Sequence, residues 1–436
     1  MSEMTATITG PEQALRTGMN ALDYLRSRGF VHDVTDEQGL RDAFANGPVT
    51  MYIGFDPTAT SLHIGNLVGI MLMANLQRLG HRPITLGGGG TVMLGDPSGK
   101  TEMRQLLTIE TIEENLRHIM PQFGRYIDYE GGRFGDNPAA MLINNADWLL
   151  KLELVPFLRD IGRHFSVNEM LAAETYKVRL ETTGLSFLEF NYRVLQAYDF
   201  LHLFQTHGCI MQAGGSDQWG NITAGVDLIR RVEGGKAFGL VTPLISTSDG
   251  RKMGKSETGA VWLDRERTSP LDFYQWWVNT TDDDIARFLR IYTFLPEDRI
   301  VDLTSVEGAA LREAKQVLAW EVTAMTHGAE AADEAATASR ALFSRDRGAA
   351  PDAAILASDA TIDLTLDGPV TIAELFVQAG LATSRNEARR LAQQGGLSLD
   401  DARVADADAQ FEPSSDIVLL RAGKKRMKYV RFSNDG

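Results

Sequence analysis

The sequence predicts an α/β fold: a doubly wound parallel sheet in a Rossmann-like domain, followed by an all-helical domain and a small α+β domain. Four short apolar segments look like strands, and amphipathic helical pattern separates each from the next: residues 51–55, 83–87, 140–144 and 210–214. Such alternation is typical of parallel sheets with helices on both faces. Across residues 282–343 strand signals disappear and helix-forming residues dominate, which predicts the helical domain.

The order of these patterns divides the 436 residues into roughly three domains and a linker. We expect the Rossmann-like domain, with an inserted helical segment, over residues 1–245. A loop with two lysines and the helical domain follow over residues 246–347. Alanine and aspartate dominate residues 348–369, which indicates a linker. The small domain then covers residues 370–436, with a helix over residues 385–393 and a basic final strand.

Composition excludes several classes of protein. The single cysteine, Cys209, rules out an intrachain disulfide framework and a zinc site built from several thiolates, and no protein-bound metal is expected. No segment is long and apolar enough to cross a membrane, and residues 1–18 lack a signal-peptide core, so we expect a cytoplasmic protein with no membrane partner. The formal net charge of −15 limits any RNA contact to local basic patches.

Two glycine-rich segments look like phosphate-binding loops without matching them. Residues 95–101 and 250–256 each place three residues between their glycines, where a P-loop needs four. The glycine run 87–90 lacks the third glycine of a dinucleotide-binding fingerprint, because Val92 and Met93 occupy the positions where it would fall. The sequence therefore predicts neither a Walker loop nor a nicotinamide site.

A polar segment joins the first predicted strand to an apolar helix expected over residues 62–79. It reads Asp-Pro-Thr-Ala-Thr-Ser-Leu-His-Ile-Gly-Asn over residues 56–66. A strand that turns into a helix gathers polar groups at the helix N-terminus, where phosphate binds. His63 and Asn66 lie three residues apart on the first expected turn, so both side chains can reach one ligand. The alternative is a pair of capping residues on an ordinary helix.

A second polar segment, Lys-Met-Gly-Lys-Ser over residues 252–256, places two lysines three residues apart. Gly250 and Gly254 beside them predict a mobile, positively charged loop. Ammonium groups such as those of Lys252 and Lys255 suit a pyrophosphate group. The alternative is a solvated surface turn.

A third pattern lies on an apolar helix expected over residues 187–204. Tyr192, Gln196 and Asp199 fall at positions i, i+4 and i+7, and therefore on one face. A polar stripe on a buried helix must face water, a partner or a ligand. The alternative is a buried network that ties the helix to the sheet.

The first two segments resemble the H-I-G-H and K-M-S-K-S signatures of class I aminoacyl-tRNA synthetases, with Asn66 for the second histidine and Gly254 for a serine. The stripe is similar to the Y-x-x-x-Q-A-Y-D motif of the tyrosyl-tRNA synthetase family. This resemblance implies a homodimer that activates L-tyrosine with magnesium-bound ATP, releases pyrophosphate and transfers tyrosine to the 3′ end of tRNA(Tyr). Two other functions stay open: an adenylyltransferase for a small acid, which uses a related turn, and a non-catalytic RNA-binding paralogue.

The resemblance also assigns roles to individual residues. Tyr192, Gln196 and Asp96 would hold the ammonium and carboxylate region of tyrosine, and Asp199 with Tyr52 would bind its phenolic hydroxyl. The remaining tyrosine contacts would be Gly54, Asp56 and Gln218. ATP would be bound by Asp56, His63, Gly65, Asp217 and Lys255. The catalytic groups would be Thr58, His63, Asn66, Lys100, Arg104, Lys252, Lys255 and Ser256.

Several of these roles have a specific physical content. Asn66 is neutral, so it would contact a phosphate or the ribose without transferring a proton. Lys100 and Arg104 would lie on a mobile basic loop that closes on pyrophosphate, although solvated side chains on a polar loop fit the sequence as well. Residues 214–221 would form a loop under the ribose, and Asn221 would cap the next helix. The C-terminal domain resembles a small RNA-binding fold shared with a ribosomal small-subunit protein, and its candidate tRNA contacts are Arg385, Arg389, Arg390, Lys424, Lys425 and Lys428.

Overall fold

The computed structural model describes residues 9–96, 107–172, 174–182, 184–248, 250, 253, 255–256, 259–342, 361–366, 368–400, 402–412, 417–423 and 426–432. The chain divides into two compact units. The first comprises Met1–Lys255, Ala260–Asp264 and Thr281–Ala314, and the second comprises Ser256–Gly259, Arg265–Thr280 and Lys315–Gly436. Residues 246–347, expected as one domain, contribute to both units. The domain boundaries drawn from the sequence remain a prediction.

The first unit is built around a six-stranded sheet with the strand order β1-β6-β5-β2-β3-β4. Its strands are β1 (Asp33–Val34), β2 (Thr50–Phe55), β3 (Arg82–Gly87), β4 (Met141–Asn144), β5 (Cys209–Gly215) and β6 (Phe238–Thr242). Neighbouring strands are parallel, except that β1 runs antiparallel to β6. The four predicted strands are confirmed as β2 to β5, and the α/β fold with them. Sequence analysis missed β6, which is buried throughout, and β1, which is too short to leave a pattern.

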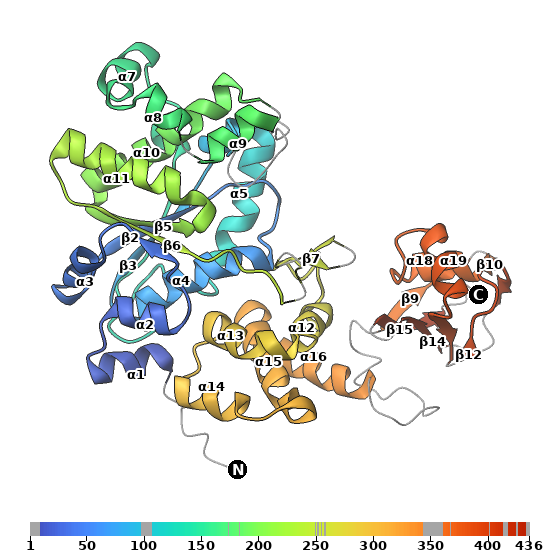
Figure 1. Ribbon diagram of the computed structural model, residues 1–436. Coiled ribbons are helices and arrows are strands. Elements are labelled where there is room, and N and C mark those ends of the chain that lie inside the picture. The colour runs from blue at the N-terminus through green and yellow to red at the C-terminus, as the bar shows by residue number, and fades with distance from the viewer. Residues whose placement is uncertain are drawn as a thin grey trace. The chain divides into compact units, whose positions relative to one another are not determined.

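Helices cover both faces of this sheet. Figure 1 shows α10 (Phe187–His207) and α11 (Trp219–Glu233) on one face and α4 (Leu67–Arg78) on the other. Helix α10 begins where the Ser186 hydroxyl accepts from the amide of Glu189 over 3.2 Å, and it ends at Gly208, whose φ of 61° is left-handed. Helix α10 therefore begins at the predicted residue and ends three residues later than predicted.

The helix expected over residues 62–79 begins later than predicted. The structure has a 3-10 turn, η1 (Ile64–Asn66), and then α4. The residues before η1 are extended and pair with residues 261–263: the Ile64 amide donates to the Val261 carbonyl over 3.0 Å, and the Leu263 amide donates to the Leu62 carbonyl over 2.8 Å. Because these backbone groups bond to another segment, they cannot form the first helical turn.

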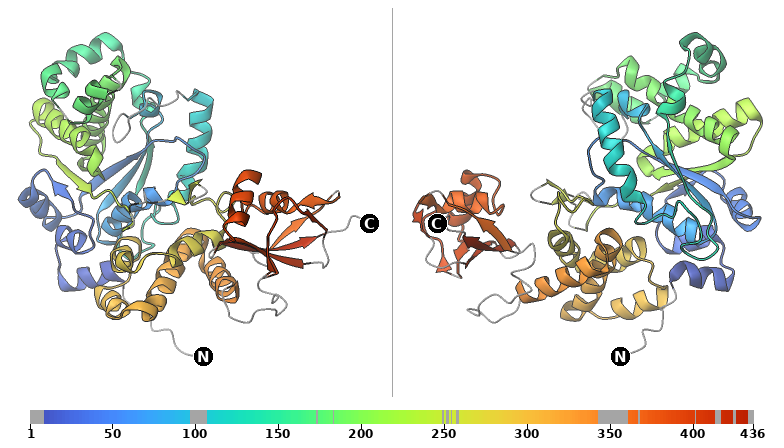
Figure 2. Two further views of the ribbon diagram at one scale, coloured as in Figure 1. Left: turned by 45° about the vertical axis from the view of Figure 1, so that its right-hand side comes forward. Right: turned by 180° about the vertical axis from the view of Figure 1, so that it is seen from behind.

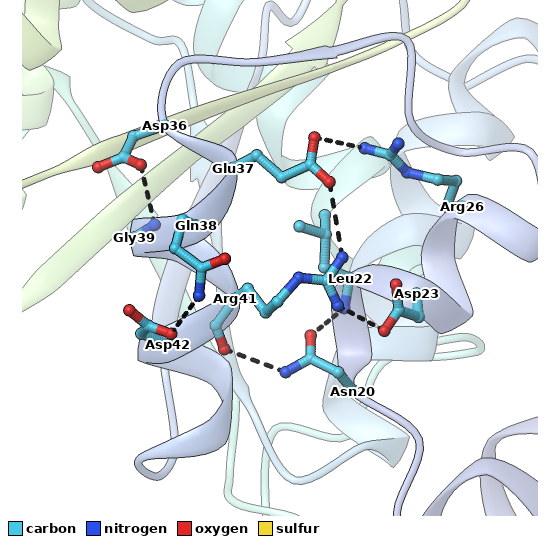
Figure 3. A network of polar contacts seen from close by, with 10 residues as sticks. All are labelled: Asn20, Leu22, Asp23, Arg26, Asp36, Glu37, Gln38, Gly39, Arg41 and Asp42. Carbon is cyan, nitrogen blue, oxygen red and sulfur yellow. Dashed lines mark hydrogen bonds and ion pairs between the residues drawn. The ribbon is translucent and has the colours of Figure 1, made fainter.

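A network of polar contacts joins α2 (Ala21–Ser27) to α3 (Glu37–Ala45) on either side of β1 (Figure 3). Glu37 pairs with Arg26 at 3.1 Å and with Arg41 at 3.5 Å. Asn20 donates to the carbonyl of Arg41 over 3.0 Å and accepts from the Leu22 amide at the start of α2. The exposed pairs contribute little energy individually, but together they hold the two helices that flank the edge strand.

The remaining elements of the first unit are short, apart from α5. They are α1 (Gly10–Thr17), η2 (Thr91–Met93), α5 (Ile109–Phe123), α6 (Ala146–Leu149), α7 (Leu154–Asp160), η3 (Gly162–His164), α8 (Val167–Leu171), α9 (Glu174–Thr182), η4 (Ser216–Gln218), α13 (Asp282–Tyr292), α14 (Glu297–Thr304) and η5 (Gly308–Leu311). Two short strands, β7 (Lys255–Ser256) and β8 (Gly259–Ala260), form a separate two-stranded sheet.

The second unit contains helices and a C-terminal module. Its helices are α12 (Pro270–Val278), α15 (Arg312–His327) and α16 (Ala329–Leu342). Helices α12 and α16 are joined by Gln275, which donates to the Ser339 hydroxyl over 2.8 Å. Within residues 282–342, all of which the structure describes, every regular element is helical, as predicted.

The C-terminal module contains a five-stranded sheet with the order β12-β11-β14-β15-β9. Figure 2 shows its two helices on one face of that sheet. Its elements are β9 (Thr361–Leu364), β10 (Val370–Thr371), α18 (Ile372–Gln378), α19 (Arg385–Gln393), β11 (Leu397–Leu399), β12 (Ala402–Arg403), β13 (Gln410–Phe411), β14 (Ile417–Ala422) and β15 (Arg426–Phe432). Strand β9 lies inside the segment expected as a linker, and it pairs in parallel with β15. The helix predicted over residues 385–393 is confirmed as α19.

Candidate active site at the carboxyl edge of the sheet

Parallel strands end together at one edge of the six-stranded sheet, and predicted site residues follow them. Phe55 pairs with Gly87, and Gly87 pairs with Asn144, so β2, β3 and β4 end level with one another. Asp56 directly follows β2, and Asn145 directly follows β4. In doubly wound sheets this carboxyl edge is where ligands bind.

Helix α5 fixes the first signature segment, residues 56–66. Asn115 donates from Nδ2 to the carbonyl of Pro57 over 2.8 Å, and Oε1 of Gln122 accepts from the Leu62 amide over 3.1 Å. Thr58 is exposed on the segment held in this way. Sequence analysis missed Asn115 and Gln122, because polar residues on an amphipathic helix carry no distinguishing pattern.

His63 and Asn66 contact each other across η1. The backbone amide of His63 donates to Oδ1 of Asn66 over 3.0 Å, so Asn66 caps the turn. The His63 ring lies edge-on to Trp262 with 6.1 Å between centroids. A Cβ on Gly65 would come within 2.7 Å of Cε1 of His63, so glycine is the residue that leaves room for this ring.

The structure brings the second signature next to the first. Met253 is buried, and its carbonyl oxygen lies 3.5 Å from the position that a Cβ on Gly65 would occupy. The structure describes Lys255 and Ser256 by their backbone, in β7. Four residues predicted in the two basic loops lie outside the described residues: Lys100, Arg104, Lys252 and Gly254.

Gln218 joins two of the predicted tyrosine contacts, Asp96 and Gln196, and one predicted ATP contact, Asp217. Its Nε2 donates to Oδ2 of Asp96 over 2.7 Å and to Oδ2 of Asp217 over 3.2 Å, and its Oε1 accepts from Nε2 of Gln196 over 3.3 Å. Asp96 and another predicted tyrosine contact, Tyr192, are both buried. The fold thus collects polar groups that follow β3 and β5 with groups on α10.

Asn221 belongs to the same cluster and does not cap α11, so that expectation is wrong. Helix α11 begins at Trp219, two residues earlier, which turns Asn221 inward. Buried there, Asn221 donates to Oε1 of Gln196 over 3.2 Å and to Oε1 of Gln218 over 3.1 Å, and it accepts from Nε of Arg193 over 3.4 Å.

Asp199 occupies the far end of the polar stripe, where its residue is 2% exposed. Its Oδ2 accepts from Nδ2 of Asn145 over 2.9 Å, and its Oδ1 accepts from Nε1 of Trp148 over 2.8 Å. Burial raises the pKa of Asp199 to about 7, against the lowering effect of these two hydrogen bonds and with a further increase from the charge of Asp56. This carboxyl group therefore changes charge near neutral pH.

Tyr52 reaches the same region from β2. It is 1% exposed and packs against Phe200 with 5.4 Å between ring centroids. Burial raises the pKa of the Tyr52 phenol well above its ordinary value, and the negative charge of Asp199 adds to this. The hydroxyl of Tyr52 has no hydrogen-bond partner in the part of the chain that the structure describes. A buried hydroxyl left in this way costs about 1–3 kcal/mol, which a hydrogen-bonding ligand would recover.

Asn145 and Trp148 are site residues that sequence analysis missed. Both follow β4, and both donate to Asp199, so the stripe is tied to the sheet by a buried network, as the alternative interpretation of the stripe held. A signal for them exists in the sequence, because both lie within four residues of the end of a predicted strand, and that end must share an edge with Asp56.

The basic residues of the C-terminal module differ in what they contact. Arg385 pairs with Glu374, and Arg389 pairs with Asp408 at 2.8 Å. On the same helix Arg390 is exposed, and Lys428 on β15 is half-buried. Lys424 and Lys425 lie outside the described residues.

The described residues contain no candidate for a metal site or for a membrane-spanning helix. No group of three or more His, Cys, Asp or Glu side chains among them could hold a metal ion. No helix among them has both the length and the apolar character needed to cross a bilayer.

Comparison with known proteins agrees with this geometry. Residues 45–344 match the family of tRNA synthetases class I (W and Y), and residues 359–430 match the tyrosine–tRNA ligase SYY-like C-terminal domain. A tyrosine–tRNA ligase of Desulfosudis oleivorans is 52% identical over 434 residues, which covers 94% of this chain and 98% of the relative. One from Clostridium botulinum is 47% identical over 417 residues, with coverage of 94% and 99%.

Solved structures give the same result. A C-terminally truncated mitochondrial tyrosyl-tRNA synthetase of Aspergillus nidulans has a TM-score of 0.68 at 32% identity, and the match covers 76% of this chain and 97% of that one. The tyrosyl-tRNA synthetase of Archaeoglobus fulgidus, complexed with L-tyrosine, shares the fold with a TM-score of 0.53 at 18% identity over 72% of this chain and 99% of that one. The chain therefore belongs to the tyrosine–tRNA ligase family of class I aminoacyl-tRNA synthetases.

Proposed function

We propose that tyrosine is selected and activated at the carboxyl edge of the six-stranded sheet, with its phenolic hydroxyl between Tyr52 and Asp199. The enzymes of this family are ligases that attach tyrosine to tRNA with ATP. One observation carries the proposal: among the described residues the buried Tyr52 hydroxyl has no hydrogen-bond partner, and it lies in the field of the buried carboxyl group of Asp199. A substrate hydroxyl that donates to Asp199 and accepts from Tyr52 would satisfy both groups.

The reaction has two steps. A carboxylate oxygen of tyrosine attacks the α-phosphorus of ATP, a new P–O bond forms, and the bond to the bridging oxygen breaks so that pyrophosphate leaves. A hydroxyl of the terminal ribose of tRNA then attacks the carbonyl carbon of tyrosyl-adenylate, and AMP leaves. Magnesium enters with ATP as part of the substrate. The protein contributes by positioning the reactants and by stabilising charge on the phosphates.

The cluster around Gln218 suits the amino-acid end of tyrosine. Asp96 is a buried carboxylate that receives a hydrogen bond from Gln218, and Gln196 contacts the same amide. A substrate ammonium group would find a negative partner in Asp96, while Gln196 and Tyr192 would orient it. Gly54 is exposed at the end of β2, where it leaves space for the substrate backbone.

The two signature segments suit the phosphates of ATP. Thr58 and His63 would contact the terminal phosphates, and Asp56, Gly65 and Asp217 would contact the nucleoside. The approach of Met253 to Gly65 supports this, because Met253 belongs to the second signature and lies next to the first. The remaining proposed contacts of the leaving pyrophosphate are Asn66, Lys100, Arg104 and Ser256.

Amino-acid-dependent exchange of labelled pyrophosphate into ATP tests this proposal. The wild-type protein should support exchange with tyrosine and discriminate strongly against phenylalanine, because Asp199 and Tyr52 would stay desolvated and unpaired without the hydroxyl. Asp199→Ala should abolish productive tyrosine binding. Unchanged tyrosine affinity in that variant would place the phenol elsewhere.

The C-terminal module is proposed to bind tRNA. Arg385 and Arg389 would first have to break their ion pairs with Glu374 and Asp408 to bind phosphate. Arg390, which is exposed, and Lys428, which is half-buried, are therefore the better candidates. Such contacts would make affinity depend on salt through counterion release. Because the aminoacylated tRNA is consumed in translation, we place this activity in the cytoplasm.

We also propose that the protein is a homodimer. The segment from α7 to the start of α10 exposes large apolar side chains: Phe187 is 82% exposed, Val155 is 73% exposed and Leu154 is 70% exposed. Apolar side chains that gather on one exposed segment often mark a protein–protein interface. A second copy of the chain would cover them.

A further inference from the structure

We infer that Thr91 is a positioning residue for tyrosine selection: its hydroxyl fixes the side-chain amide of Asn145 so that this amide donates to Asp199. The inference rests on the proposed role of Asp199 at the substrate hydroxyl.

Both N–H groups and the oxygen of the Asn145 side-chain amide have hydrogen-bond partners. The residue is 1% exposed. Its Oδ1 accepts from the backbone amide of Gly90 over 2.7 Å, and its Nδ2 donates to Oγ1 of Thr91 over 3.0 Å and to Oδ2 of Asp199 over 2.9 Å. An asparagine amide has two N–H groups, so both are used. A turned amide would instead point its carbonyl oxygen at the carboxylate of Asp199, which is repulsive.

The Thr91 hydroxyl is also buried among polar partners. Thr91 is 4% exposed. Its Oγ1 accepts from Asn145, so its single proton must point elsewhere, and the two acceptors in that direction are Oδ1 of Asp56 and the carbonyl of Gly88, each at 3.4 Å. Donation therefore runs from Asn145 to Thr91 and on towards Asp56 or the Gly88 carbonyl, so Thr91 lies between the carboxyl group of Asp199 and the first signature.

The glycine run after β3 is shaped for this network. A Cβ on Gly88 would lie 2.4 Å from Oδ1 of Asp56 and 2.9 Å from Oγ1 of Thr91. One on Gly90 would lie 3.3 Å from Oδ1 of Asn145. Because the residues at these positions have no Cβ, the side chains of Asp56, Thr91 and Asn145 have room to meet.

Selection follows from the direction of these bonds. Asp199 receives donors from Asn145 and Trp148, and it remains an acceptor that a phenolic O–H can satisfy. Without the Thr91 hydroxyl the amide of Asn145 loses an anchor and can turn, and Asp199 then loses a donor. Tyrosine would be bound less well, whereas phenylalanine has no hydroxyl and would be unaffected.

The test compares Thr91→Val, which has the same shape without the hydroxyl, with Thr91→Ser, which keeps it. Pyrophosphate exchange is measured with the full-length protein for tyrosine, phenylalanine and ATP. We expect Thr91→Val to raise the tyrosine KM about tenfold, and to lower the ratio of the tyrosine to the phenylalanine kcat/KM by about the same factor. The ATP KM and the phenylalanine kcat/KM should stay within about twofold, and Thr91→Ser should restore the ratio.

Three outcomes would overturn the inference: an unchanged ratio in Thr91→Val, parallel losses for all three substrates, or a Thr91→Ser variant as impaired as Thr91→Val. Should Thr91→Val fail to fold in a thermal melt, Thr91→Ala removes the same hydroxyl. Asp199→Ala is measured alongside. If Asp199→Ala lowers the ratio of the tyrosine to the phenylalanine kcat/KM strongly and Thr91→Val does not, only the inference about Thr91 fails. If Asp199→Ala leaves this ratio unchanged, the proposed role of Asp199 fails too.

Discussion

The side-chain amide of Gln218 donates to Asp96 over 2.7 Å across 122 residues of sequence. The two groups follow different strands, and they meet because β3 and β5 end at one edge of the sheet. A buried carboxylate that keeps its charge needs such a donor. Because Oε1 of Gln218 also accepts from Nε2 of Gln196 over 3.3 Å, Gln218 ties Asp96 to the helix that carries Gln196.

The contact predicts the effect of Gln218→Ala. Removing the amide leaves Asp96 with one donor fewer and removes one of the hydrogen-bond partners of Gln196, so the tyrosine KM should rise about five- to tenfold, as for a hydrogen bond of about 1 kcal/mol. The KM for ATP should change much less. Steady-state pyrophosphate exchange measures both. Gln205→Ala, which removes an exposed amide that contacts Glu233, is the matched control and should behave as wild type. Equal changes in both KM values would remove Gln218 from the tyrosine site.

The pKa of Asp199, raised by burial to about 7, predicts a pH-dependent tyrosine KM. Below that pH the carboxyl group is protonated and accepts less well from the substrate hydroxyl, so the tyrosine KM should rise as the pH falls from about 8 to about 6. The phenylalanine kcat/KM should lack this inflection. A flat tyrosine profile across this range would contradict the assignment.

The raised pKa of Asp199 also predicts how the free energy of unfolding changes with pH. The folded state holds a proton on Asp199 more tightly than the unfolded state, where the ordinary pKa is 3.8. The associated stabilisation is therefore complete below about pH 4 and is lost as the pH rises to about 7.

Lys255→Ala should separate binding from chemistry. The ammonium group would meet charge only as pyrophosphate departs, so the tyrosine dissociation constant should stay nearly unchanged while adenylate formation slows by a factor on the order of 10²–10³. Rapid-kinetic measurement of adenylate formation gives both quantities. Asn66→Ala should have a smaller effect, because Asn66 is neutral and already caps η1. A large loss of tyrosine affinity in Lys255→Ala would move this lysine into the amino-acid site.

Removing the C-terminal module should separate adenylation from tRNA charging. The sequence suggests ending the chain near Gly368, but β9 (Thr361–Leu364) pairs with β15, so the cut belongs before residue 361. The shortened protein should exchange pyrophosphate at close to the full-length rate and charge tRNA poorly. Both assays run on one preparation. Normal charging would exclude the module from RNA binding, and parallel losses in both assays would make it a stabilising element.

Phe187→Asp should weaken the proposed dimer. The side chain is 82% exposed, so the change should not unfold the subunit, but it would place a charge in an apolar interface. Sedimentation velocity over a dilution series should show monomer at concentrations where the wild type is dimeric. Leu15→Asp, at a residue that is 54% exposed on α1, is the control and should leave the dimer intact. Monomeric wild-type protein would refute the proposal.

The sequence by itself determined the elements with strong local patterns. The strands β2 to β5, the helix α10 and the helix α19 follow from apolar period, capping residues and turn signals, which act over a few residues. The two signatures and the polar stripe of α10 could be recognised for the same reason. Each is a short segment in which the spacing of a few residue types is distinctive.

Only the tertiary structure decided which groups meet. Nothing local predicts that residues 62–64 pair with residues 261–263, and this pairing is what delays the start of the signature helix. Asn145, Trp148 and Thr91 reach Asp199 or its neighbours because parallel strands align their ends, a relation between segments that are remote in sequence. Local patterns record what one segment prefers, whereas the energy of a buried polar network depends on partners supplied by several segments at once.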